Sequence, residues 1–278
     1  MTRRRPAQSA SADDLLTTLG RLAARARERA ELQHARVELA EVLQRQMLPA
    51  TLPDVTGLSA VARYTPARDG LDIGGDWYDG FLLPDGSIGY SIGDVQGHDV
   101  EAAAFMGQVR IGIRAVAAGT ADPGEVLSRA NDLLLSVDSS LFATCTFLRF
   151  DPATWELHSA RAGHVAAVWA TVDGRSGTAE GEGGLPLGIL PGETYPVTRR
   201  QLTTAGAFVL VTDGVIEGPS FPIEEGLARV TRLAGAGAAG APGELADEVM
   251  KVAEFTGHSD DAAVLVMSHD AAPGYRNG

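Results

Sequence analysis

The sequence has 278 residues and a single cysteine, Cys145. One thiol excludes a disulfide or a multi-thiolate zinc site within one chain, and it fits a reducing compartment, so we expect a cytoplasmic protein. No run of about 18 apolar residues occurs, which predicts that no segment spans a membrane. The N-terminus is basic but has no apolar stretch behind it, so we do not expect a secretory signal.

Basic residues are also scarce, with 23 Lys and Arg against 36 Asp and Glu, for a net charge of −13. The first 46 residues hold nine Arg and six acidic residues, a balance of +3, so the rest of the chain carries −16. Nucleic-acid binding needs a basic surface, and an acidic body argues against it. Acidic side chains would instead suit cation binding if they converge.

The segment 13–49 is rich in Ala, Leu, Arg and Glu, and its composition predicts a helix that ends at Pro49. Leucines recur at 15, 19 and 22, but the heptad pattern is poor further on. Two interpretations stay open: a solvated helix packed on its own domain, or a coiled-coil helix that forms a homodimer. We therefore divide the chain into a helical segment 1–50, a domain 51–270 and a disordered tail 271–278.

The remainder reads as paired strands with a few helices, at 99–119, 122–138 and 243–255. Asp122 is placed to cap the second of these, with Pro123 at its first position. The Ala/Gly-rich run 234–242 reads as a flexible connector. Long helices beside antiparallel strands indicate an α+β layered domain rather than a parallel nucleotide-binding sheet.

The stretch "GGDWYDGFLLPDGSIGYSIGDVQGH", residues 74–98, predicts a hairpin around the turn at Asp85. In that register the numbers of paired residues sum to about 170, so Asp76 lies opposite Asp94 at the open end, with Cα atoms about 5 Å apart. Like charges placed opposite each other are unfavourable unless a cation or a shared proton compensates. The hairpin therefore predicts electrostatic repulsion between Asp76 and Asp94 at its open end.

Two further acids follow or precede apolar strands: Asp213 ends "FVLVT", and Asp260 precedes "AAVLVM". In an antiparallel sheet one strand's end lies beside its neighbour's beginning, so all four acids are expected at one sheet edge. Oxygen ligands favour Mg²⁺ or Mn²⁺, and several carboxylates suggest two ions. For any one Asp taken alone, a turn or cap role is the more usual interpretation.

A set of short motifs then occurs in a fixed order: "LQRQMLPATLP", "GGDWYD", "GDVQGH", "EAAAFM", "FATCTF", "AGH", "LPLGIL", "VTDGVIE" and "DDAAVLVM". Together they resemble the metal-dependent PPM-type (protein phosphatase 2C-like) serine/threonine phosphatases. The branch is that of the stage II sporulation protein E and bacterial stress-response phosphatases. The resemblance, over residues 43 to 268, implies an antiparallel β-sandwich flanked by helices, with two Mn²⁺ or Mg²⁺ ions at one edge.

The resemblance also implies site residues. Asp76, Asp94, the backbone carbonyl of Val95, Asp213 and Asp260 carry over as metal ligands, with Asp261 the other choice for the last. Hydrolysis of phosphoserine or phosphothreonine would use a metal-activated water, with no Ser, Cys or His nucleophile. His98 would orient that water or transfer a proton, or else make a hydrogen bond at the start of the following helix.

The branch implies a phosphorylated anti-anti-sigma-type regulator as substrate, and hence a role in sigma factor regulation. The alternative is a catalytically silent binding module on the same fold, which the presence of all four carboxylates argues against. A nucleotide cyclase of the "GGD" type does not fit Trp77 and Tyr78 after the Asp. One departure from the family pattern is Asp99, where the motif usually has Gly; it either attracts a further cation or caps the next helix.

Overall fold

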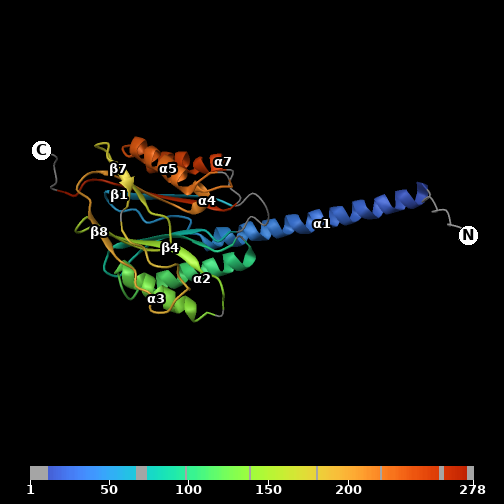
Figure 1. Ribbon diagram of the computed structural model, residues 1–278, viewed down its shortest axis with the longest axis horizontal. Coiled ribbons are helices and arrows are strands. Elements are labelled where there is room, and N and C mark those ends of the chain that lie inside the picture. The colour runs from blue at the N-terminus through green and yellow to red at the C-terminus, as the bar shows by residue number, and fades with distance from the viewer. Residues whose placement is uncertain are drawn as a thin grey trace, which may run out of the picture.

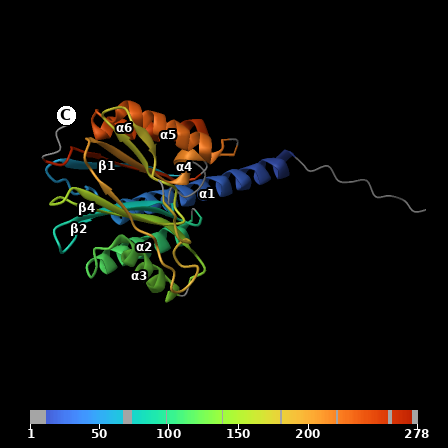
Figure 2. The same cartoon turned by 60° about the vertical axis from the view of Figure 1, so that its left-hand side comes forward.

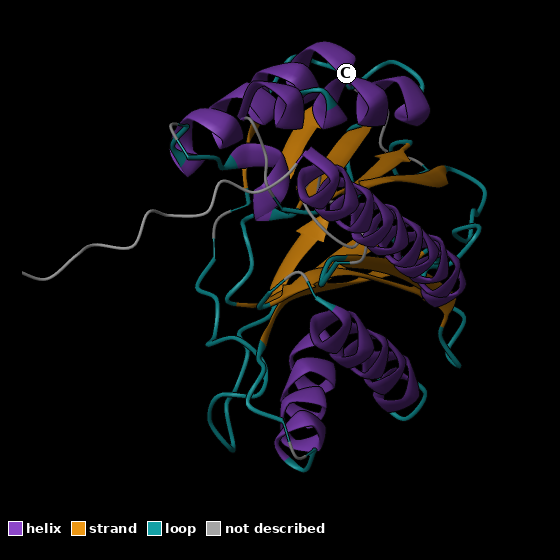
Figure 3. Ribbon diagram, turned by 90° about the vertical axis from the view of Figure 1, so that its right-hand side faces the viewer, coloured by secondary structure: helices purple, strands orange, loops and turns teal. Residues whose placement is uncertain are grey.

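The computed structural model describes residues 12–66, 74–97, 99–137, 139–179, 181–219, 221–256 and 260–273. Over these residues the chain forms two five-stranded antiparallel sheets packed face to face, each covered on its outer side by helices (Figures 1 and 3). The predicted α+β sandwich flanked by helices, preceded by an N-terminal helix, is confirmed.

The first sheet has the strand order β1-β10-β9-β6-β7. Its strands are β1 (Leu58–Thr65), β10 (Ala262–His269), β9 (Gly206–Val211), β6 (Val168–Thr171) and β7 (Ser176–Thr178). Helices α5 (Ile223–Gly237) and α6 (Pro242–Met250) pack on its outer face, with the short helices α4 (Asp213–Ile216) and α7 (Val252–Thr256) beside them.

The second sheet has the order β2-β3-β4-β5-β8. Its strands are β2 (Trp77–Leu82), β3 (Ile88–Val95), β4 (Ala143–Asp151), β5 (Glu156–Ala162) and β8 (Thr198–Gln201). Helices α2 (Val100–Ala117) and α3 (Pro123–Leu135) cover its outer face. Figure 2 shows the two sheets between the two helical layers.

Strand β3 has one face in the apolar layer between the two sheets and the other in the layer beneath the helices. Ile88, Tyr90 and Ile92 are fully buried in the layer between the sheets. The alternate positions Gly89, Ser91 and Gly93 lie on the face that α2 covers and carry small residues. At Gly93 a Cβ atom would lie 2.2 Å from the Trp77 ring, so only glycine lets that buried indole pack across the hairpin.

Helix α1 (Ala12–Met47) extends away from the sandwich, as Figure 1 shows. Its C-terminal residue Met47 and the following Leu48 pack against the core formed with α2, whereas Leu16, Leu19, Leu22 and Leu32 are more than half exposed. Among the described residues no helix is long and apolar enough to cross a bilayer. The tail beyond residue 273 lies outside the described residues.

Two predictions about the C-terminal third are wrong in part; of the predicted connector 234–242, residues 238–241 do join two helices. Residues 234–237 are the last turn of α5 rather than a flexible connector, and Ala234 and Ala238 are buried. The small residues serve close packing, since a Cβ atom at Gly237 would lie 2.9 Å from the Leu245 side chain of α6. The predicted helix 243–255 is divided at Lys251 into α6 and α7.

Candidate functional site

The hairpin of β2 and β3 has the predicted register. Trp77 pairs with Gly93 and Tyr78 with Ile92, which places Asp76 and Asp94 opposite each other at the open end. Asp76 is buried, with 2% of its surface exposed, and Asp94 is half-buried. Burial and the neighbouring carboxylates, Asp94 first among them, raise the pKa of Asp76 well above its usual range. When no cation is bound, the pair is therefore more stable with one carboxyl group protonated than with both ionised.

Asp94 experiences the same environment. Burial, followed by the charges of Asp213 and Asp260, raises its pKa to about 8, and a hydrogen bond with Asp76 opposes the rise. Sharing one proton between the two carboxyl groups would reduce the repulsion between them. Without a compensating cation, the cluster does not carry its full negative charge at neutral pH.

The other sheet supplies the remaining acids. Asp213 follows β9 as the first residue of α4, and burial followed by the charge of Asp260 raises its pKa. Asp260 and Asp261 precede β10, which pairs with β9 so that the end of one strand meets the start of the other. We expected all four acids at one sheet edge; they lie instead at the matching ends of two facing sheets, two from each.

Asp260 and Asp261 differ in where they lie. Asp260 is exposed and acts electrostatically on Asp94 and Asp213. Asp261 is buried, with 1% of its surface exposed, and its carboxylate fills the space beside Gly74, where a Cβ atom would lie 0.9 Å from Oδ2. Asp261 also acts electrostatically, on Asp76 and Asp94, while it packs against the start of the hairpin, so the choice between Asp260 and Asp261 as the last ligand stays a prediction.

Thr212 connects the two sheets at this point. Its Oγ1 donates a 2.6 Å hydrogen bond to Asp76 Oδ2 and accepts a 2.8 Å bond from the Ala263 backbone N–H. The hydroxyl is buried, so the bond fixes the orientation of the Asp76 carboxylate. Nothing in the sequence pattern singled out Thr212; its place directly before Asp213 in "VTDG" is the only signal.

Gly75 leaves a small space lined by oxygen atoms. A Cβ atom there would lie 2.4 Å from the Val95 carbonyl oxygen, 3.0 Å from that of Gly97 and 3.1 Å from Asp94 Oδ1. Carboxylate and carbonyl oxygens around one point are the donors that Mg²⁺ and Mn²⁺ prefer. As the described side chains lie, no group of three or more His, Cys, Asp or Glu has metal-holding geometry. The donor chemistry thus fits a divalent cation, and the ligand assignment stays a proposal.

Two histidines occur in the motifs near the acid cluster, His98 and His164. His98 lies outside the described residues. His164 is buried, and its Nδ1 lies 2.8 Å from Thr144 Oγ1. Burial and then the charge of Arg161 lower its pKa to about 3, so the ring is neutral at physiological pH. Because Thr144 pairs with Asp94 across β4 and β3, His164 supports the strand beside the acid cluster.

Asp79 is a buried acid that the motif reasoning did not use. It follows Asp76 by three residues on β2 and points to α2, where its carboxylate pairs with Arg110 at 2.9 Å and Arg114 at 2.7 Å. Arg114 also lies over the Phe81 ring, 4.7 Å from its centroid. The hairpin that carries Asp76 and Asp94 is thereby fixed to the helix that follows it.

The sandwich and its acid cluster define a protein of the PP2C-type phosphatase class. A family model described as "Stage II sporulation protein E (SpoIIE)" matches residues 84–270, and the chain belongs to that family. Among curated relatives, the phosphoserine phosphatase RsbU of Bacillus subtilis is 26% identical over 182 residues, which cover 65% of this chain and 53% of RsbU. Protein IcfG of Synechocystis is 27% identical over 213 residues, 66% of this chain and 33% of IcfG.

Solved structures of related proteins have the same fold. The RsbU and RsbW domains of Rv1364c from Mycobacterium tuberculosis match with a TM-score of 0.72 and 31% identity, covering 81% of this chain and 64% of that one. The SiaA-PP2C domain of Pseudomonas aeruginosa matches with a TM-score of 0.69 and 23% identity over 89% of this chain and 99% of that one, which supports the fold. The chain spans about a third of the length of IcfG and about half of RsbU.

Proposed function

We propose that this protein is a metal-dependent phosphatase that hydrolyses phosphoserine or phosphothreonine in a protein substrate. The supporting observation is the convergence of Asp76, Asp94 and Asp213 from two sheets, with the pKa of each raised by burial and by its acidic neighbours. Such a cluster is unfavourable unless positive charge is bound there. The relative RsbU is itself called a phosphoserine phosphatase.

Asp76, Asp94, the Val95 carbonyl, Asp213 and Asp260 would hold two Mn²⁺ or Mg²⁺ ions. When bound, such ions polarise phosphoryl oxygens and make a water molecule more acidic. The chain's own contribution is to position these oxygens: Thr212 orients Asp76, and the hairpin register fixes Asp94 opposite it. Gly75 keeps the space beside Asp94 and Val95 open for a ligand.

The substrate we propose is a small phosphorylated regulator of the anti-anti-sigma type, and hence a role in cytoplasmic control of transcription. This part rests on the stress-response branch to which the motifs belong and on the likeness to RsbU. Comparing phosphoproteins from cells with and without the protein would identify the substrate, because its phosphorylated form should accumulate in the cells that lack the protein.

The activity is tested by Mn²⁺- or Mg²⁺-dependent hydrolysis of p-nitrophenyl phosphate and a phosphopeptide. Asp94→Ala and Asp213→Ala should each abolish turnover while the circular dichroism spectrum stays unchanged. Asp173→Ala, which removes an exposed acid paired with Arg175 at the far end of the sandwich, is the matched control and should be fully active. Undiminished turnover in either site variant would contradict the ligand assignment. No metal-dependent hydrolysis by the unaltered protein, even on a cognate phosphoprotein, would favour the silent binding module.

We also propose the division into a helical segment 1–50 and a phosphatase domain 51–270, with self-association through α1. The exposed Leu16, Leu19 and Leu22 are the observation that motivates it, since they lie along the part of the helix that extends from the body (Figure 1). Light scattering should give a dimer for the full chain and a monomer for the variant with Leu19→Glu and Leu22→Glu. Equal masses for the two proteins would exclude this interface.

A further inference from the structure

His164 lies where the chain passes from one sheet to the other. Strand β5 of the second sheet ends at Ala162, and β6 of the first sheet begins at Val168. Between them, Gly163 has the left-handed φ of +64°, and a Cβ atom on it would lie 2.6 Å from the Pro186 ring, so this tight turn requires glycine. The residue after the turn is His164, of whose surface only 3% is exposed.

The imidazole ring of His164 interacts with one strand of each sheet. Its Nδ1 lies 2.8 Å from the hydroxyl of Thr144 on β4, in the second sheet. Burial and then the charge of Arg161 lower the pKa of the ring, and the backbone carbonyl of Val211, the last residue of β9 in the first sheet, opposes them as a nearby acceptor. Nε2 makes no hydrogen bond of normal geometry with the described residues, so the bond to Thr144 is the one that orients the ring.

Thr144 is the immediate neighbour of a proposed metal ligand. In the register of β3 and β4 it pairs with Asp94, and the side chains of paired residues lie on the same face with Cβ atoms about 4.5–5.5 Å apart. That face lies between the sheets, since Ile92, two residues before Asp94 on the same strand, is buried in the core there. His164 is therefore hydrogen-bonded to the residue directly beside Asp94.

On the facing sheet the ring lies next to the segment that carries the other acids. Val211 is followed by Thr212, whose hydroxyl donates to the Asp76 carboxylate, and then by Asp213 at the start of α4. One buried side chain thus connects the two strand ends from which Asp94 and Asp213 approach each other.

The pair of His164 and Thr144 differs from the rest of the layer between the sheets. Further from the acid cluster, apolar side chains such as Leu148 on β4 and Leu210 on β9 fill that layer. Apolar contacts are non-directional, whereas a hydrogen bond fixes both the distance and the angle between its two groups. A buried polar pair is unfavourable unless it is hydrogen-bonded, so its use at this point indicates that orientation matters there as well as burial.

We propose that His164 is a positioning residue of the metal site: by joining Thr144 to the end of β9, it holds Asp94 and Asp213 at the separation that bound cations need. This inference rests on the proposed metal-dependent activity. In this role His164 does not touch the cation or the substrate, and it acts only through the strands that carry the ligands. Groups that orient metal ligands typically contribute about 10–100-fold to metal affinity, and ligand positions have to be held to within about 0.5 Å.

The test uses the full chain and measures Mn²⁺ affinity by calorimetry. His164→Leu fills a similar volume without a polar atom and should bind Mn²⁺ about 10–100-fold more weakly. Half-maximal activation of p-nitrophenyl phosphate hydrolysis should need correspondingly more Mn²⁺, while turnover at saturating Mn²⁺ should approach that of the unaltered protein. His164→Asn, whose amide can take the place of Nδ1, should recover most of the affinity.

Thr144→Val tests the other member of the pair. The variant keeps the shape of the side chain and loses the hydroxyl, so it should weaken Mn²⁺ binding to a similar extent. The double variant with His164→Leu should bind no more weakly than either single variant, because both substitutions remove the same interaction. Thr144 is only partly buried, so this variant carries the test if His164→Leu does not fold.

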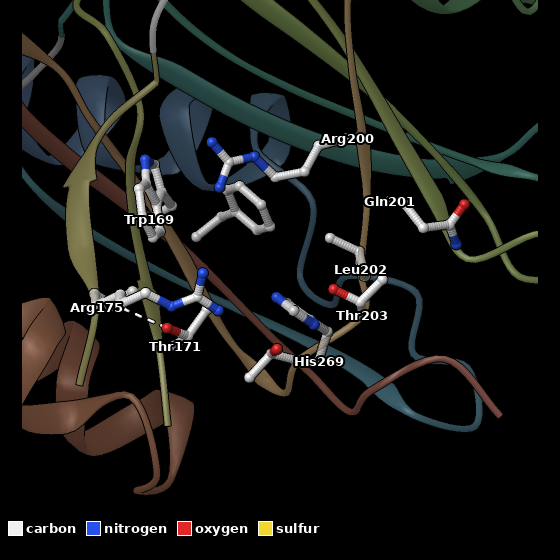
Figure 4. Close-up of a pocket in the computed structure, with 11 residues that line it drawn as sticks. Trp169, Thr171, Arg175, Arg200, Gln201, Leu202, Thr203 and His269 are labelled. Atoms are coloured by element: carbon white, nitrogen blue, oxygen red, sulfur yellow. Dashed lines mark hydrogen bonds between the residues drawn. The ribbon is translucent and has the colours of Figure 1, made fainter. Parts of the chain in front are cut away.

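His269→Leu is the matched control. His269 is also buried and also hydrogen-bonded through Nδ1, which lies 3.0 Å from the Asp270 carbonyl oxygen. It ends β10, roughly 25–30 Å from Asp260 at about 3.3 Å per residue, and lines a cavity of about 180 Å³ together with Trp169 and Arg200 (Figure 4). This variant should lose stability but keep the Mn²⁺ affinity of the unaltered protein.

Amide hydrogen exchange gives a readout that needs no metal. With a chelator present, the amides of Val95 and Thr212, which are hydrogen-bonded at the two strand ends, should exchange faster in His164→Leu than in the unaltered protein and at the same rate in His269→Leu. Unchanged exchange at both amides, or a His164→Leu variant that loses stability but keeps full Mn²⁺ affinity, would overturn this inference alone. Absence of Mn²⁺ binding by the unaltered protein would instead contradict the proposed activity, and this inference with it.

Discussion

The hydroxyl of Thr212 donates a 2.6 Å hydrogen bond to the buried carboxylate of Asp76, joining residues 136 positions apart on opposite sheets. The same oxygen accepts the Ala263 N–H, so it has one proton to donate and directs it at the carboxylate. This hydrogen bond therefore connects the open end of the β2–β3 hairpin to the end of β9 on the facing sheet.

Thr212→Val keeps the shape of the side chain and removes both hydrogen bonds. The Asp76 carboxylate and the Ala263 N–H would be left buried without this partner, for which we expect a loss of about 1–3 kcal/mol in the free energy of unfolding. We also expect weaker Mn²⁺ binding, measured by calorimetry, because Asp76 is no longer oriented. Thr212→Ser restores the hydroxyl and should recover Mn²⁺ affinity. Equal affinities for the Val and Ser variants would show that the hydroxyl does not orient Asp76.

The acid cluster predicts how stability depends on pH. Burial and neighbouring charge raise the pKa of Asp94 from 3.8 to about 8, and those of Asp76 and Asp213 change in the same direction. In this range the folded metal-free protein binds more protons than the unfolded chain, so its stability falls as pH rises from about 4 to about 8. Urea unfolding with a chelator should show this decline. Saturating Mg²⁺ should remove it, because the cation stabilises the charged form.

Asp94→Asn gives the control for that experiment. The amide cannot ionise, so the metal-free variant should show a shallower decline with pH than the unaltered protein, and Mg²⁺ should stabilise it less. A metal-free protein whose free energy of unfolding stays level or increases between about pH 5 and 8 would contradict the electrostatic description of the cluster.

The register of one hairpin was predictable because a two-stranded antiparallel pair is fixed by its turn, and the turn at Asp85 is marked by Pro84 and Gly86. The convergence of Asp213 and Asp260 with that pair was predicted in outline, but a pattern of strands does not say which of them share a sheet. Thr212 and Asp79 were missed for a related reason. Their partners, Asp76 and two arginines on α2, are distant in sequence, and only the packing brings them together.

Helix α5 was missed because its C-terminal turn, "LAGAG", has the composition of a loop. Glycine has low intrinsic helix propensity, and here tertiary packing overrides it. Ala234 is fully buried, and Gly237 allows α6 to approach closely. The cavity lined by Trp169, Arg200 and His269 could not be predicted from the sequence either, since these residues come from three separate strands.

Asp79 should be among the acids on which stability depends most. Its side chain is 1% exposed and pairs with Arg110 and Arg114, which are 13% and 42% exposed. Asp79→Ala leaves the largely buried Arg110 and the partly exposed Arg114 without this partner, and removing one member of a buried pair typically costs about 3–5 kcal/mol. Chemical unfolding measures this. Asp173→Ala, which removes one member of an exposed pair, should change stability by about 1 kcal/mol or less. Similar losses in the two variants would contradict the buried-pair interpretation.

Asp99, where the related phosphatases usually have Gly, is the N-cap of α2. Its Oδ1 accepts a 2.9 Å hydrogen bond from the Ala102 N–H, so of the two predicted roles the structure confirms the helix cap. Asp99→Ala should lower the free energy of unfolding by about 0.5–2 kcal/mol, and Asp99→Ser should lose much less because serine also caps. Because the side chain is committed to the helix start, Asp99→Ser should keep its Mn²⁺-dependent turnover, in contrast to Asp94→Ala. A serine variant that folds normally yet loses metal-dependent turnover would instead place Asp99 among the cation-binding groups.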